Sequence, residues 1–312
     1  VDWLHTDLTR GVDAAWLPTI YPPVAQLYFR SVAGIAESIR AFRLAALACD
    51  VAIGLALLAL LRATGRPPGW VLVYAWHPLL PLEGALGAHL DVAGVLLLVL
   101  SWLALVRHRT MAAALMFAAA VLVKPLPLVL APLYWRRVRV RDVLAAAAAG
   151  GVLTLWVARG NLPFGSMGAF IDDFRFNGPL FALLEQAVPA RLLAGGAIAC
   201  GLLVAVVLRR RHDAVSPTAW AWPMTAALAA APVIYPWYFV WIVPFTLGLR
   251  AIPVWVWSLS VLAVYPTWHF RRLGGPFAVP DALMTLEFAL PAAAAVWVGV
   301  RLLRAGDKPT YD

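Results

Sequence analysis

The stretch FRLAALACDVAIGLALLALL, residues 42–61, decides the fold class of this chain. It contains twenty residues, nearly all apolar. A helix of about twenty apolar residues is long enough to cross the hydrocarbon core of a bilayer. Comparable apolar runs follow along the chain and alternate with short basic segments. We therefore expect an all-α, polytopic bundle of transmembrane helices with about 9–11 membrane segments, forming a single domain over residues 1–312.

The other expected membrane segments show the same pattern. They are residues 90–106, 110–135, 142–158, 191–208, 218–234, 236–250, 252–268 and 281–300. The run 110–135 contains the sequence Lys-Pro-Leu-Pro from Lys124, which predicts two short helices in a hairpin because proline breaks a helical ladder. Two segments stay ambiguous. Residues 20–38 carry Arg30 and Glu37, and residues 70–82 are short, so length slightly favours 20–38 as a crossing segment.

Composition excludes several classes of protein. The 312 residues are 63% hydrophobic and 13% charged, whereas soluble domains are about 25% charged. Mean hydropathy is +0.81. These values exclude a soluble enzyme, a disordered chain and a secreted module held by disulfides. The two cysteines, Cys49 and Cys200, lie in apolar runs without metal-ligand spacing, and we interpret them as small core residues.

The basic residues between the apolar runs predict an orientation. They are Arg107, Arg109, Arg136, Arg137, Arg139, Arg141, Arg209, Arg210, Arg211, Arg301, Arg304 and Lys308. Loops rich in lysine and arginine stay in the cytoplasm, so the net charge of +9 indicates membrane topology rather than a nucleic-acid partner. Residues 159–190 and the turn around Tyr235 then lie outside. Arg271 and Arg272 also lie outside, against the rule, where they could hold an anionic group.

Several ionisable residues lie within or beside apolar segments, where a charge costs ~2.5–3.5 kcal/mol on insertion scales. Asp50 fits an interhelical hydrogen bond or ion pair. Lys124 either extends to an interface or holds a phosphate at a broken helix. His89 and Asp91 are two residues apart, so they fit a helix start better than one helix face, and a charge on Asp91 there suits the helix dipole. The His-x-Asp pattern alone is a weak metal or acid–base motif.

Four stretches, and a fifth further along, occur in an order that resembles a known family. They are residues 18–29, PTIYPPVAQLYF; residues 76–91, WHPLLPLEGALGAHLD; residues 124–132, with Lys124, Pro125, Pro127 and Pro132; residues 174–181, FRFNGPLF; and YPWY at 235–238. Over nearly its whole length the chain resembles the bacterial polyprenol-phosphate-mannose-dependent mannosyltransferases of the GT-C superfamily. The resemblance implies a GT-C-like bundle in the bacterial cytoplasmic membrane, with its active site facing the extracytoplasmic side.

The resemblance also implies a reaction. A sugar, by the resemblance mannose, passes with inversion from a polyprenyl-phosphate donor to a hydroxyl of a glycan or glycolipid acceptor. Such a transfer needs a carboxylate that takes a proton and positive groups at the departing phosphate.

We assign candidate residues to these roles. Asp91, His89 and Glu83 are the catalytic candidates, with Asp91 and His89 positioning sugar or acceptor and Asp91 as a fallback base. The substrate-binding candidates are Tyr21, Lys124, Asn177, Trp237, His269, Arg271 and Arg272. Among these, Lys124, His269 or the pair Arg271 and Arg272 would meet the phosphate, whereas Asn177 and Trp237 would line the sugar pocket.

The sequence departs from the family in its first residues. In the family an acidic motif of the first outer loop, ahead of the Tyr-Pro-Pro segment, supplies the usual base, and that motif is absent here. We therefore expect either an N-terminally truncated chain or a divergent, catalytically inactive member. A transporter of lipids or small molecules is a further alternative, although no internal repeat supports it. Many enzymes of this fold use a divalent metal and others do not, and no ligand cluster in the sequence assigns a metal or another cofactor.

Overall fold

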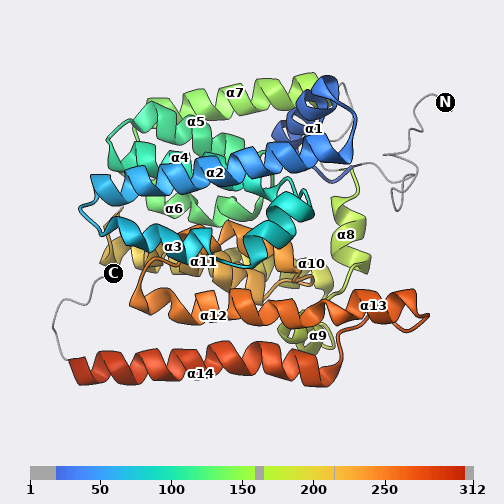
Figure 1. Ribbon diagram of the computed structural model, residues 1–312. Helices are drawn as coiled ribbons and strands as arrows, with labels where there is room; N and C mark the ends of the chain where they lie inside the picture. Colours follow the sequence, from blue (N-terminus) through green and yellow to red (C-terminus); the bar gives the residue numbers. More distant parts are fainter. Residues whose placement is uncertain (1–18, 159–164, 214, 306–312) are drawn as a thin grey trace.

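The computed structural model describes residues 19–158, 165–213 and 215–305, and throughout these ranges the chain folds into helices without a strand (Figure 1). Five helices in this part of the chain are long and apolar enough to cross a membrane. They are α2 (Ile39–Ala63), α7 (Val140–Ala158), α10 (Ala190–Arg211), the run Leu249–Arg272, and α14 (Asp281–Ala305). The expected all-α polytopic bundle is therefore confirmed, and the chain is a multi-pass membrane protein.

A sixth span is formed only if a bent pair of helices counts as one. Residues Leu80–Leu86 form η3, a π-helical turn, and α4 (Asp91–Val106) follows at an angle of 112°. The other expected segments consist of shorter helices: α5 (Thr110–Val121), η4 (Leu126–Leu130), α6 (Ala131–Tyr134), α11 (Thr218–Ala229) and η5 (Pro236–Trp241). Prolines at the starts of η4, α6 and η5 explain this fragmentation, because proline has no amide hydrogen for a helical ladder.

The break at Lys124 is confirmed. Helix α5 ends at Val121, and the chain then doubles back through η4 and α6, so that the ring of Tyr134 lies 4.3 Å from the ring of Phe117. The interruption leaves Lys124 between two short helices rather than in the middle of a continuous span.

Of the two ambiguous segments, the first is too short to cross. Helix α1 (Pro23–Ile35) has 13 residues, a length of about 20 Å at 1.5 Å per residue. The hydrocarbon core is about 30 Å thick. The expectation that length favours residues 20–38 is therefore corrected, because the helix within that segment covers only its 13 residues Pro23–Ile35.

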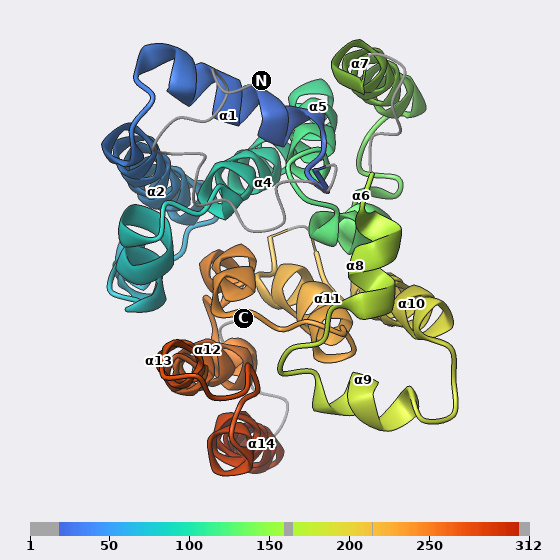
Figure 2. The same cartoon turned by 90° about the vertical axis from the view of Figure 1, so that its right-hand side faces the viewer.

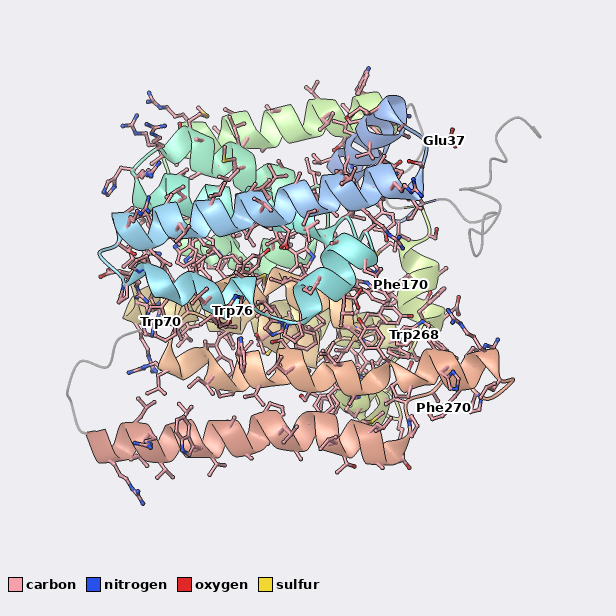
Figure 3. All side chains as sticks on the ribbon, viewed as in Figure 1. Glu37, Trp70, Trp76, Phe170, Trp268 and Phe270 are labelled. Carbon is pink, nitrogen blue, oxygen red and sulfur yellow. The ribbon has the colours of Figure 1, made fainter. Side chains whose placement is uncertain are left out.

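The second segment belongs to a broken run that follows α2 in the opposite direction. It contains η2 (Pro68–Trp70), α3 (Val71–Ala75) and η3. The Tyr74 hydroxyl donates a hydrogen bond to Asp50 in the middle of α2, and the Arg43 Nε donates to the Leu86 carbonyl near the start of α2. Figure 3 shows the same direction, with Trp70 near the far end of α2 and Glu37 beside its start. Asp50 thus makes the interhelical hydrogen bond that its position predicted.

Basic segments gather at one end of the bundle. Thr110 Oγ1 donates to Asp142 Oδ2 at 2.6 Å, and Arg137 Nη2 donates to the His212 carbonyl at 2.9 Å. These bonds join the α4–α5 turn, the start of α7 and the end of α10, and Figure 1 shows α14 finishing at the same end. The short helices α1, α8 (Met167–Asp173) and α13 (Pro266–Arg272) lie toward the opposite end, which Figure 2 views directly. Lys308 lies outside the described residues.

Helix α4 is packed against η5 so closely that only glycine fits at position 94. A Cβ added to Gly94 would overlap the Trp241 indole, and it would lie 3.0 Å from Val123 Cγ1. We expect the change Gly94→Ala to lower the free energy of unfolding by about 1–3 kcal/mol, the usual range for overpacking. Reversible unfolding in detergent measures this change. Gly54→Ala on α2 is the matched control, because a Cβ there meets nothing within 4 Å. Equal stability of the two variants would contradict the close packing.

Candidate functional site

The first part of the candidate site is a buried ion pair between Asp91 and Lys124. Asp91 is the first residue of α4, where the helix dipole favours a negative charge, and it is only 2% exposed. Its Oδ1 accepts hydrogen bonds from Lys124 Nζ at 2.8 Å and from Trp241 Nε1 at 2.5 Å. Lys124 Nζ also lies 4.0 Å from the centre of the Tyr238 ring. The broken helix and the helix start, both expected from the sequence, thus place opposite charges in contact.

The second part of the site is a pair between Glu83 and His89. Glu83 lies on η3 and is 4% exposed. Its Oε2 is 3.0 Å from His89 Nε2, and its Oε1 accepts a hydrogen bond from the Tyr265 hydroxyl. The side chain of His89 remains 29% exposed. A carboxylate that binds one ring nitrogen of a histidine fixes the ring and leaves the other nitrogen to exchange a proton.

Helix η5 joins the two pairs. Its Trp237 stacks on His89 with ring centroids 4.5 Å apart, and its Tyr238 and Trp241 contact Lys124 and Asp91. The four residues Glu83, His89, Asp91 and Lys124 are spread over 42 positions of the sequence. In the fold they form two pairs, and both pairs lie against η5. Together they bring a cation, two carboxylates and an imidazole into one region of the bundle.

An apolar cavity of about 270 Å³ opens beside Lys124. Tyr21, Lys124 and Tyr238 form part of its wall, and apolar side chains of η4, α8, α10 and α11 form most of the rest, among them Leu126 and Ile198. Tyr21 was expected to bind substrate, and the structure places it at this cavity. The arrangement is a lysine ammonium at one wall of a hydrophobic hollow.

Other candidate residues do not line this cavity. Asn177 is buried at 6% exposure, and its Nδ2 donates to both carboxylate oxygens of Glu287, at 2.9 and 3.1 Å. It therefore ties its loop to α14, and it lines a separate hollow of about 450 Å³. Its place at a sugar pocket stays a prediction. His269, Arg271 and Arg272 lie exposed on α13, outside the lining of the Lys124 cavity, because the last turns of that helix extend beyond the packed bundle.

Trp237 lies at the centre of the site, and its expected role in lining the sugar pocket stays a prediction. His89 stacks on its indole, and Tyr235 stacks on it as well, at 4.3 Å. Since His89 stacks on the indole, Trp237 fixes the orientation of the His89 ring.

Several site residues were missed by sequence reasoning. Trp241, Tyr238 and Tyr265 contact the charged groups directly. The aromatic run YPWYFVW at 235–241 contains both Trp241 and Tyr238 and could have indicated them, but only Trp237 of this run was predicted to be a site residue. Nothing in the sequence links Tyr265 to Glu83, which lies 182 positions earlier.

The segment after residue 164 is held by two ion pairs, one exposed and one half-buried. Arg191 Nη2 donates to Asp172 Oδ2 at 2.6 Å, and Arg175 Nε donates to Glu185 Oε2 at 2.8 Å. The hydrogen bond from Arg191 lowers the pKa of Asp172 below its usual value, and the one from Arg175 does the same to the pKa of Glu185. These pairs order the chain next to the site without entering the cavity.

Within the described residues, no group of three or more His, Cys, Asp or Glu side chains is placed to hold a metal ion. No family model, no curated protein and no solved structure matches the chain. The resemblance to GT-C mannosyltransferases therefore stays a prediction from the sequence stretches alone.

Proposed function

We propose that this protein is a membrane glycosyltransferase. It would move a sugar, by the sequence resemblance mannose, from a polyprenyl-phosphate donor to a hydroxyl of an extracytoplasmic glycan or glycolipid, with inversion. The observation that carries the proposal is the position of Lys124, an ammonium at the wall of an apolar cavity. A lipid phosphate suits both features, because its phosphate pairs with an ammonium and its hydrocarbon chain fits an apolar cavity.

Lys124 suits the phosphate end of the donor. Its ammonium has three hydrogens, and the bond to Asp91 uses one of them. The others are available to an oxygen of the phosphate, where negative charge develops as the sugar leaves. The lining of the cavity beyond Lys124, which includes Leu126, Leu128 and Ile198, suits the first isoprene units of the lipid.

The pair of His89 and Glu83 suits the acceptor end. Inverting transfer needs one group that takes the proton of the attacking hydroxyl. His89 is the more exposed partner, and Glu83 holds its Nε2, so we assign His89 as the base and Glu83 as the residue that orients it. Asp91 is engaged by both Lys124 and Trp241, which favours a positioning role over that of a base.

The distribution of charge supports the expected orientation. The basic ends of α4, α10 and α14 and the basic start of α7 lie at the end of the bundle away from α1 and α13 (Figure 1). By the positive-inside rule this end is cytoplasmic, so the site faces outward from the plasma membrane of a bacterium.

A transfer assay tests the proposed reaction. Purified protein in liposomes is incubated with radiolabelled polyprenyl-phosphate mannose and a membrane extract that supplies acceptors. We expect labelled glycan or glycolipid that forms only with the protein present. Movement of intact donor across the bilayer without product would instead identify a transporter, and the absence of both would identify an inactive relative.

Cysteine labelling tests the orientation separately. In a variant with Cys49 and Cys200 replaced by alanine, single cysteines are introduced as Asp173→Cys and Arg210→Cys. Both positions are exposed, at opposite ends of the bundle. We expect a membrane-impermeant thiol reagent added to intact cells to label position 173 and to spare position 210. The reverse pattern would invert the orientation.

A further inference from the structure

A second hollow lies at the opposite end of the bundle from Lys124, and the proposed transfer reaction makes no use of it. Its volume is about 520 Å³, and it lies between the α4–α5 turn and the start of α7. Three arginines line it, Arg109, Arg139 and Arg141, and all three are exposed. We propose that this hollow binds the phosphate headgroup of an anionic phospholipid in the adjacent leaflet.

Charge is the first argument. The lining contains the three arginines and a single carboxylate, that of Asp142. Asp142 is 2% exposed, and its Oδ2 accepts a hydrogen bond from Thr110 at 2.6 Å. Its Oδ1 lies 3.7 Å from Arg141 Nε, so this carboxylate offsets one of the three positive charges and the lining keeps an excess of two. An arginine offers planar, paired donors that match the oxygens of a phosphate.

Backbone geometry adds to the side-chain charge. Helix α5 begins at Thr110 and α7 begins at Val140, and the bond between Thr110 and Asp142 brings these two N-termini together. Each N-terminus carries a partial positive charge and unpaired amide hydrogens. The hollow therefore combines two helix N-termini with three arginine side chains.

The apolar surroundings favour a lipid over a free anion. Met111 and Leu115 line the hollow along α5 and are 40% and 41% exposed. On α7, Val143 and Leu144 are 49% and 64% exposed one turn below the arginines. Since α7 is long and apolar enough to cross the membrane, its start lies near the interface and these side chains face acyl chains. Basic hollows between membrane helices are typical places for anionic lipid headgroups.

Lipid titration of the purified protein tests this site. Short-chain phosphatidylglycerol and phosphatidylcholine are added separately to protein in neutral detergent, and native mass spectrometry reports the bound fraction. We expect phosphatidylglycerol to bind more than about tenfold more tightly than phosphatidylcholine, since each arginine near an anionic headgroup contributes about fivefold. The triple change Arg109→Gln, Arg139→Gln and Arg141→Gln is expected to abolish this preference.

Two control variants distinguish lipid binding in the hollow from a general effect of positive charge at this end of the bundle. The triple change Arg210→Gln, Arg211→Gln and Arg304→Gln removes the same charge from the same end of the bundle, and it should keep the preference. Replacing the three lining arginines by lysine should also keep it.

Three results would overturn the proposal: equal binding of the two lipids, an equal loss in the control triple variant, or displacement of phosphatidylglycerol by inorganic phosphate at similar concentration. The last result would identify a free-anion site instead. The Lys124→Ala variant should bind phosphatidylglycerol normally, so failure of this proposal is distinguishable from failure of the proposed transferase.

Discussion

Replacing Lys124 by alanine is expected to lower the rate of sugar transfer by about 10²–10³-fold, the usual effect of removing one group that stabilises developing negative charge. The same change leaves Asp91 buried at 2% exposure without its cation. Breaking a buried ion pair from one side destabilises a protein by about 3–5 kcal/mol. The transfer assay measures the first effect, and unfolding in detergent measures the second.

A paired variant separates these two effects. The double change Lys124→Met and Asp91→Asn removes both charges and keeps the side chains similar in size, so we expect most of the lost stability to return while activity stays low. Arg191→Ala is the matched control for loss of a cation from an ion pair, because its pair with Asp172 is exposed. Recovery of activity in the double variant would show that Lys124 acts only through stability.

Replacing His89 by glutamine is expected to lower kcat by about 10²–10⁴-fold, the range that general acid–base catalysis contributes. The KM for the lipid donor should change little, since the donor phosphate is assigned to Lys124 on the other side of η5. Glu83→Gln should show a smaller loss of kcat, because the amide still reaches His89 but no longer carries a charge. Steady-state kinetics with varied donor and acceptor measure both variants.

The contrast between the two halves of the site is the test of the assigned roles. Lys124→Ala should raise the donor KM and His89→Gln should not. His108→Gln, an exposed histidine at the opposite end of the bundle, serves as the control and should leave kcat unchanged. A normal kcat in His89→Gln would remove His89 from the proton-transfer step.

The parts of the fold and site that could be predicted from sequence depend on local chemistry. Prolines around Lys124 predict the broken helix, and the position of Asp91 before an apolar run predicts a helix start. Asp50 within a span predicts a polar partner on a neighbouring helix, and the structure supplies Tyr74. The first inference rests on the missing amide hydrogen of proline, and the other two rest on the cost of a polar group in an apolar segment.

The parts that could not be predicted depend on contacts between distant residues. The partner of Asn177 is Glu287, 110 positions later, and neither residue lies in a motif. The return of residues 68–86 along α2 occurs in short helical pieces, none of which is long enough to cross a membrane by itself. Hydropathy reports where apolar residues are, whereas the course of a broken segment is set by packing against its neighbours.

The most direct test of the central claim is the affinity of the purified protein for a short-chain polyprenyl phosphate without a sugar. The account predicts saturable binding that weakens by more than about tenfold in Lys124→Ala, because one ammonium–phosphate contact is lost. Binding should weaken likewise in Ile198→Trp, which fills the apolar cavity, and should stay unchanged in Arg210→Ala, an exposed residue at the opposite end of the bundle. Equal affinity in all four proteins would contradict the claim that Lys124 and its cavity hold a lipid phosphate.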